Sequence, residues 1–130
     1  MMNSTPQPPS IARAMVIPTK RSIMEALRAA MDYCGYDLYE LMSSKVRTRV
    51  YADLRAIVWS IYQDELKSSS RRVGYDFGWS RATVYSAVTK ANELKTVDRE
   101  FSDMYDAIHG AFINALSLQR ENNKKEIKTA

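Results

Sequence analysis

Basic and hydroxyl side chains concentrate in one stretch of the chain, residues 80–90, which contains no acidic residue. Guanidinium, ammonium and hydroxyl groups donate hydrogen bonds to phosphate oxygens and to acceptor atoms on base edges. On a helix of about 100° per residue, one outward face and its flanks collect the candidate contact residues: Arg81, Ala82, Thr83, Tyr85, Ser86, Thr89 and Lys90. The chemistry that this set offers is non-covalent recognition of an anion.

The opposite face of the same stretch is apolar. Apolar residues recur there at spacings of three and four, which predicts a helix buried on one side: Val84, Ala87, Val88, Ala91 and Leu94. Ser80 is the expected N-cap, because its hydroxyl can accept a hydrogen bond from a backbone N–H of the first turn. The predicted helix therefore holds its polar face outward.

A second, shorter helix is expected just before this one. Val73 and Phe77 lie one turn apart, and Gly78 tolerates the left-handed backbone that ends a helix. A short helix, a turn with glycine and an exposed polar helix are typical of a helix-turn-helix, whose second helix enters the DNA major groove. The alternative is an ordinary helical hairpin with a polar face, and this stretch alone leaves both open.

The composition predicts an all-α protein. The chain has 130 residues, of which 45% are apolar, with only four glycines and four prolines. Long runs of period 3.6 then favour one compact helical domain of about six helices, with an extended C-terminal helix. The net charge is +4, and residues 45–99 hold eleven basic against six acidic side chains. This excess favours an anionic partner.

The sequence offers no recognisable set of catalytic residues. Cys34 and His109 are the single cysteine and histidine, so one protomer has no disulfide, Cys/His metal site or His-based catalytic pair. Four carboxylates are expected to be the solvated first turns of one helix: Asp98, Glu100, Asp103 and Asp106. We therefore expect no enzyme, metal, cofactor or small-molecule substrate. No run approaches the ~20 apolar residues that cross a bilayer, so we expect a protein that does not use a membrane. The single cysteine fits a reducing compartment, so we expect the protein to be cytoplasmic.

Proline and charge patterns divide the chain into three parts. Residues 1–20 contain all four prolines among polar residues and predict a flexible N-terminal arm. Residues 21–118 form the predicted helical domain. Residues 119–130 form a charged C-terminal tail that is expected to fray.

Within the domain, capping boxes at Ser22–Glu25 and Asp37–Glu40 predict the starts of two helices. A basic loop, Ser43–Arg49, leads to a long central helix over residues 48–66. After the helix that carries the polar face, residues 95–97 are expected to be a polar link. Asp98 is expected to cap a last helix with this apolar stripe: Phe101, Met104 or Tyr105, Ile108, Phe112 and Leu116.

Three blocks of the chain carry a resemblance to a known family. Residues 37–57 contain a short helix, a Ser-Lys-x-Arg loop and an Arg-x-Ile; residues 73–94 contain Val-Gly-x-x-Phe and then Thr-Val; residues 100–108 are EFSDMYDAI. In this order they resemble the C-terminal DNA-binding domain of the bacterial replication initiator DnaA, over about three-fifths of the chain. The resemblance implies a Trp-repressor-like helical fold and a double-stranded DNA partner.

The resemblance also implies roles for matching residues. Arg47 matches an arginine that enters the minor groove, whereas Arg49 and Thr83 match contacts to the phosphate backbone. The alternative for Arg47 and Arg49 is a solvated basic loop. We expect further phosphate contacts from Lys45, Arg72 and Lys90, and we include Ser80 in the predicted interface.

This chain departs most strongly from the family at the motif Arg-Asp-His-Thr-Thr-Val. Residues 79–84 are Trp-Ser-Arg-Ala-Thr-Val, with one residue fewer after Phe77. The base-reading Asp and His are absent, and Arg81 occupies the place of the histidine. Arginine can bind guanine and Ala82 can meet a thymine methyl, so we expect a different target site. Trp79 is expected to pack in the turn, the alternative being a cover on the sugar-phosphate.

Two functions remain open at this stage. The first is sequence-specific DNA binding in replication or transcription control, without an ATPase module. The second is an adaptor or inhibitor that keeps the fold and binds a replication protein instead. The apolar stripe continues through Phe112 and Leu116, past the resemblance, and could form a homodimer through the C-terminal helix.

Overall fold

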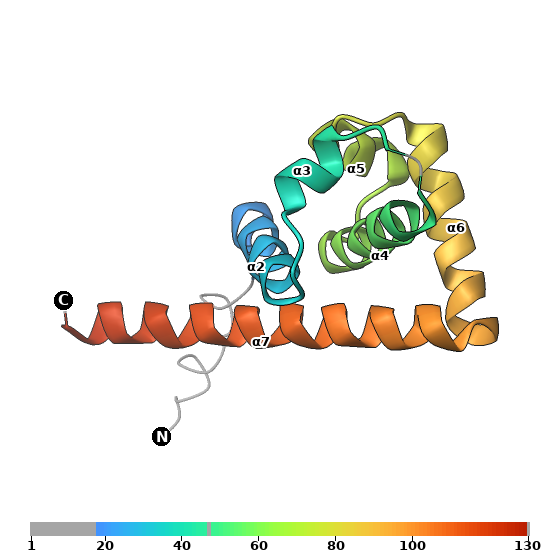
Figure 1. Cartoon of the computed structure of the whole chain (residues 1–130). Coiled ribbons are helices and arrows are strands. Elements are labelled where there is room, and N and C mark those ends of the chain that lie inside the picture. Colours follow the sequence, from blue (N-terminus) through green and yellow to red (C-terminus); the bar gives the residue numbers. More distant parts are fainter. Residues whose placement is uncertain (1–17, 47, 130) are drawn as a thin grey trace, which may run out of the picture.

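The central element of the structure is helix α4, Arg49–Leu66, whose residues 54–62 are all buried. The computed structural model describes residues 18–46 and 48–129, with side chains up to residue 122. These residues form six helices and no strand (Figure 1), which confirms the all-α prediction. The others are α2 (Lys20–Tyr33), α3 (Leu38–Ser43), α5 (Ser70–Phe77), α6 (Arg81–Val97) and α7 (Arg99–Thr129).

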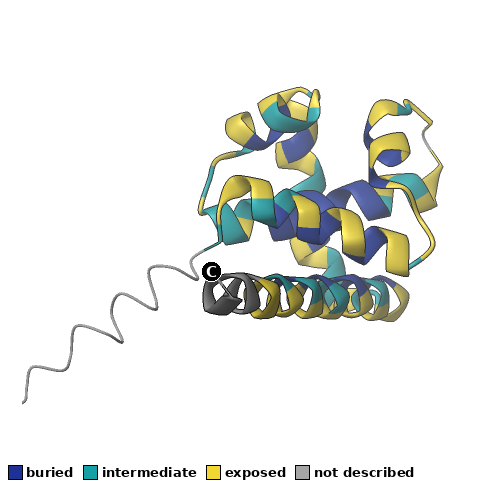
Figure 2. Cartoon of the chain, turned by 90° about the vertical axis from the view of Figure 1, so that its left-hand side faces the viewer, coloured by how far each residue is buried: buried dark blue, intermediate teal, exposed yellow. Residues whose placement is uncertain are grey.

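The other helices surround α4. Helix α7 lies along one side of the body and packs against α2, while α6 packs against both α4 and α5 (Figure 1). Buried residues gather on α4 and on the inner sides of its neighbours, and the outer side of α7 is exposed (Figure 2). The apolar stripe of α7 buries Tyr105, whereas Met104 is only partly buried. With 31 residues, α7 is about 46 Å long at about 1.5 Å per residue.

Hydroxyl and carboxyl side chains cap the N-terminal ends of the helices, and the predicted start of α2 is wrong. Helix α2 is capped by Thr19 instead of Ser22: the Thr19 hydroxyl accepts from the Ser22 N–H at 3.1 Å, and the Ser22 hydroxyl accepts from the Thr19 N–H at 2.8 Å. Two hydroxyls three residues apart form this reciprocal pair, so the serine is the inner partner. At α3, Asp37 caps through the Tyr39 N–H.

The predicted link at residues 95–97 is also wrong. Helix α6 continues to Val97, and only Asp98 separates it from α7. The Asp98 backbone N–H donates to the Leu94 carbonyl at 2.9 Å, while its carboxylate accepts from the Phe101 N–H at 3.1 Å. One residue therefore ends α6 and, as predicted, caps α7. The ammonium of Lys95 lies 4.3 Å from the Tyr105 ring centroid, which favours continued helix at the junction.

The predicted tails have different outcomes. Residues 1–17 lie outside the described residues, and α2 begins at Lys20, the last residue of the predicted arm. The backbone of α7 remains helical through residues 119–129, where the charged tail was expected. No helix in the described ranges has both the length and the apolar character needed to cross a bilayer.

Candidate nucleic-acid interface

Helices α5 and α6 are joined by a turn that brings their backbones into close contact. Gly78 ends α5 with a left-handed φ of 78°, and the Trp79 N–H donates to the Gly74 carbonyl at 2.9 Å. A Cβ on Gly74 would overlap the Trp79 carbonyl oxygen. Val73 is buried, and Phe77 is half-buried with its ring 4.9 Å from that of Tyr62. The two helices are thus fixed relative to each other at the turn.

Ser80 begins α6 as predicted, and it also orients Thr83. The Ser80 hydroxyl accepts from the Thr83 N–H at 3.1 Å and donates to the Thr83 hydroxyl oxygen at 2.8 Å. Thr83 is an exposed residue, and because its hydroxyl oxygen only accepts from Ser80, its own proton can be donated to an outside acceptor. Together with the positive end of the helix dipole, this arrangement suits a phosphate oxygen.

The outward face of α6 is exposed along its first three turns. All of the residues predicted for it are exposed: Arg81, Ala82, Thr83, Tyr85, Ser86, Thr89 and Lys90. Within the described part of the chain, neither Arg81 nor Lys90 forms an ion pair within 4.0 Å. Arg81 is therefore available to an anionic partner, and Lys90 is also available but is attracted at longer range by the Asp53 carboxylate.

The basic loop before α4 lies against the turn that precedes α6. The exposed Lys45 places its ammonium 3.7 Å from the centroid of the Trp79 ring. The Trp79 indole N–H donates to the Met42 carbonyl at 2.8 Å, and the ring meets the Trp59 ring edge-on at 5.5 Å. Trp79 thus packs in the turn, as expected, and also joins it to the loop. Arg47 lies outside the described residues, so its predicted role stays a prediction.

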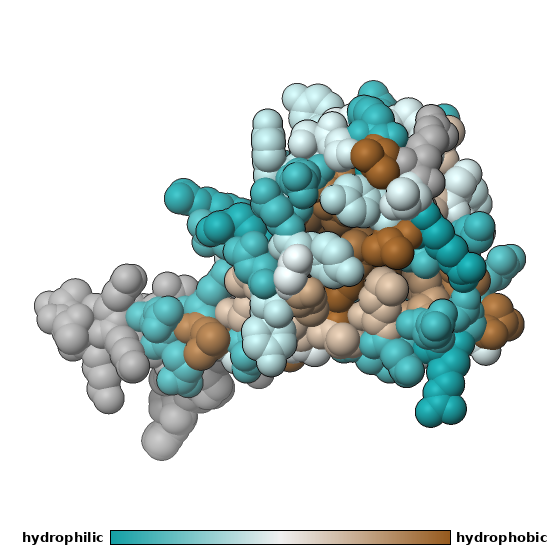
Figure 3. Space-filling view, in the orientation of Figure 1, coloured by the Kyte–Doolittle hydropathy of each residue, from teal (hydrophilic) through white to brown (hydrophobic). Residues whose placement is uncertain are grey.

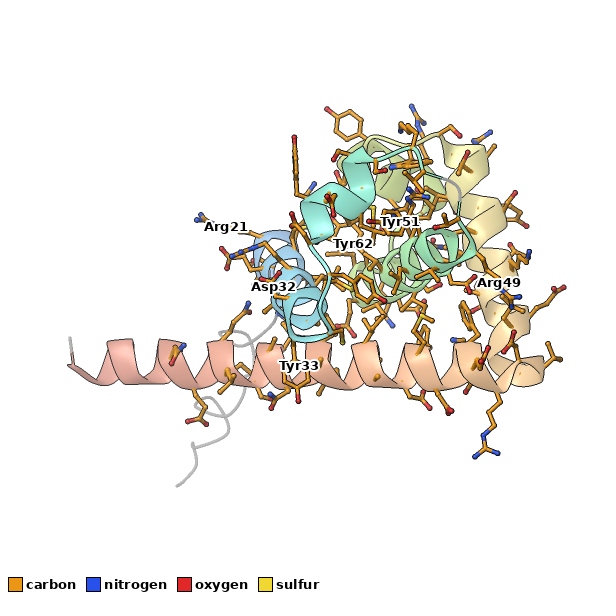
Figure 4. All side chains as sticks on the ribbon, in the orientation of Figure 1. Arg21, Asp32, Tyr33, Arg49, Tyr51 and Tyr62 are labelled. Atoms are coloured by element: carbon orange, nitrogen blue, oxygen red, sulfur yellow. The ribbon has the colours of Figure 1, made fainter. Side chains whose placement is uncertain are left out.

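Arg49 is exposed, but two carboxylates share its charge. Its guanidinium lies 3.0 Å from the Asp98 carboxylate and 3.7 Å from that of Asp53 (Arg49 is labelled in Figure 4). Burial raises the pKa of the Asp53 carboxyl above its usual value, while Arg49 opposes that rise. A phosphate at Arg49 would have to compete with Asp98.

Arg72 is similarly placed beside an acid. Its guanidinium lies 3.9 Å from Asp76, which also binds the Lys20 ammonium at 3.1 Å. The same carboxylate accepts from the Tyr62 hydroxyl at 2.8 Å. Burial and this acceptor raise the pKa of Tyr62 far above its usual value, which keeps the phenol protonated. Asp76 therefore ties α2 and α4 to α5, and Arg72 is only partly available.

Sequence reasoning missed the structural role of Arg55. It is 5% exposed within the otherwise apolar middle of α4, where its guanidinium donates to three backbone carbonyls of α3 and the basic loop: Leu41, Ser44 and Val46. A lone arginine between Leu54 and Ala56 was the available signal, because a buried cation requires partners.

An apolar hollow lies beside Asp76, which is part of its lining. It is bordered by α2, α3 and α5 and lined mainly by Met24, Leu38, Met42 and Phe77. Hydrophobic side chains gather near the centre of the face in Figure 3. The described residues contain no cluster of three or more His, Cys, Asp or Glu side chains that could hold a metal ion.

Comparison with protein-family models, with curated proteins and with solved structures finds no match for this chain.

Proposed function

We propose that this chain is a sequence-specific double-stranded DNA-binding module. Helices α5 and α6 form a helix-turn-helix, with α6 as the recognition helix. The observation that carries the proposal is the exposed outward face of α6, where neither Arg81 nor Lys90 has an ion-pair partner within 4.0 Å among the described residues. The resemblance to the C-terminal domain of DnaA supports the same assignment. It would act in replication or transcription control.

The geometry suggests how the module would bind. The N-terminal end of α6 enters the major groove, where Arg81 and Ala82 meet base edges. Thr83 donates its hydroxyl proton to a phosphate, and Lys45 and Lys90 add charge on either side of the groove. Tyr85, Ser86 and Thr89 extend the contact along the helix.

The proposal is tested by selecting duplexes from a random pool and measuring affinity against salt. Lys45 and Lys90 supply two phosphate contacts, and Arg49 and Arg72 raise the total to four if they leave their acids. At about −0.9 per phosphate, the log–log slope should lie between about −1.8 and −3.6. Affinity should then fall about 12-fold to 150-fold between 50 and 200 mM salt. A flat salt dependence would exclude DNA binding, and a pool without an enriched motif would exclude sequence specificity.

A second candidate function is formation of a homodimer or docking of another protein. The apolar stripe at Phe112 and Leu116 that was expected to make this contact is buried within the chain, so it cannot serve. The exposed side of α7 and the neighbouring α2 offer a different apolar surface, on which Tyr33 is 86% exposed and Leu118 57% exposed, and the two line the same hollow. This surface suits a homodimer contact or docking of a replication protein. Light scattering distinguishes a monomer from a dimer, and a partner that stays bound after nuclease treatment would favour the adaptor function.

A further inference from the structure

Arg55 is a charged side chain in a buried position, where a charge without partners would destabilise the fold. Its residue is 5% exposed, at the centre of α4. A buried guanidinium is stable only when hydrogen bonds replace the water that it has lost. Its Nε donates to the Leu41 carbonyl at 3.0 Å, and its Nη2 donates to the carbonyls of Ser44 at 2.7 Å and Val46 at 2.9 Å.

These carbonyls belong to the end of α3 and to the loop after it. The last four carbonyls of a helix have no partner within the helix, and cations are favoured at that end. Leu41 is in the last turn of α3, while Ser44 and Val46 flank Lys45. Arg55 therefore holds the loop backbone on both sides of Lys45.

The same guanidinium also reaches the turn before α6. Its central carbon lies 4.7 Å from the centroid of the Trp79 ring. That ring is 3.7 Å from the Lys45 ammonium, and its N–H donates to the Met42 carbonyl. The buried arginine and Trp79 thus connect the basic loop to the start of α6 through side chains of α4 and of the turn.

We propose that Arg55 is a positioning residue for DNA binding, which holds the loop at Ser44–Val46, and with it Lys45, against the start of α6. The inference rests on the function proposed above. Arg55 itself is too buried to reach a phosphate. Its effect is to order the loop before DNA arrives, so that the ordering cost is not subtracted from the binding free energy.

Arg55→Lys tests this role because it keeps the charge but cannot donate in a planar fork to three carbonyls. Releasing even one loop residue should weaken DNA binding about 10-fold. Arg28→Lys is the matched control, since Arg28 is exposed on α2 and should have no effect. Circular dichroism reports whether the helices persist.

A double-mutant cycle distinguishes positioning from a general structural loss. The effect of Arg55→Lys should largely disappear when Lys45→Ala is already present, because both act through the loop. It should add in full to Lys90→Ala, far along α6. If the effect adds equally to both, the positioning role is wrong while DNA binding stands.

Trypsin supplies a readout that needs no DNA. Cleavage after Lys45 should be faster in Arg55→Lys than in the wild type, and unchanged cleavage would contradict the proposal. If Arg55→Lys does not fold, Trp79→Phe removes the indole donor to the Met42 carbonyl and keeps a ring; the same cycle and cleavage assay then apply. A wild-type chain that binds no DNA would remove the proposed function, whereas the cleavage result would still report how the loop is held.

Discussion

Replacing Asp98 by asparagine should strengthen DNA binding. Asp98 holds the Arg49 guanidinium at 3.0 Å while its other oxygen caps α7 by accepting from the Phe101 N–H. Asparagine is as good an N-cap as aspartate, so the start of α7 is kept. The substitution removes the nearer of the two carboxylates that compete with a phosphate for Arg49 and leaves Asp53 at 3.7 Å.

The size of the effect follows from this one ion pair. If Arg49 gains one phosphate contact, the log–log salt slope should become steeper by about 0.9. At 0.1 M salt, one more released counterion corresponds to up to about 8-fold tighter binding. The loss of stability should be small, at most about 1 kcal/mol, because the Arg49 side chain is 73% exposed.

The assay is a fluorescence titration of a selected duplex at several salt concentrations. Asp32→Asn is the control, since it removes the same charge from α2, on the far side of the body from Arg49 (Figure 4). A gain shared by both variants would reflect net charge alone. If Asp98→Asn changes neither the affinity nor the slope, DNA does not approach the end of α6, and the contact predicted for Arg49 is wrong.

Three further predictions concern the exposed face of α6, the turn between α5 and α6, and the carboxyl of Asp53. Arg81→Ala should lose about 1–3 kcal/mol of binding free energy at one base position and relax the sequence preference there. Lys90→Ala should weaken binding to all sequences alike. Competition between single-base variants of the duplex measures both effects. Equal losses on every sequence for both variants would contradict the base-reading role. Gly74→Ala should destabilise the protein by about 1–3 kcal/mol because its Cβ meets the backbone of the turn, which outweighs the gain of about 1 kcal/mol in helix propensity. Gly110→Ala has open space around the added Cβ and should stabilise the protein by up to about 1 kcal/mol. Denaturant melts measure the free energy of unfolding of both variants, and an equal change in the two would refute the packing argument. Asp53→Asn should raise the melting temperature at pH 7, because burial raises the pKa of that carboxyl and its ionisation opposes folding. The gain should vanish as the pH falls below the usual value of 3.8, where the wild-type carboxyl is neutral, and a gain that grew in acid would show the opposite sign.

The sequence alone determined the features that depend on neighbouring residues. Gly78 ends α5, Ser80 caps α6, and the three- and four-residue spacing from Val84 decides which face of α6 is buried. Each involves at most a few turns of helix, so local backbone geometry and hydrophobic burial are sufficient to predict it. The exposed cations at Arg81 and Lys90 follow from the same periodicity. Their DNA contacts stay predictions, as do those inferred from the resemblance.

Only the tertiary structure decided which charges are available. Arg49 and Asp98 are 49 positions apart, and their pairing depends on how α4 meets the junction of α6 and α7. Arg55 and Arg81 are equally charged in the sequence, yet one is buried against loop carbonyls and the other stands in solvent. A charge is neutralised or left free by groups that folding brings near it, and residue spacing carries no record of that approach.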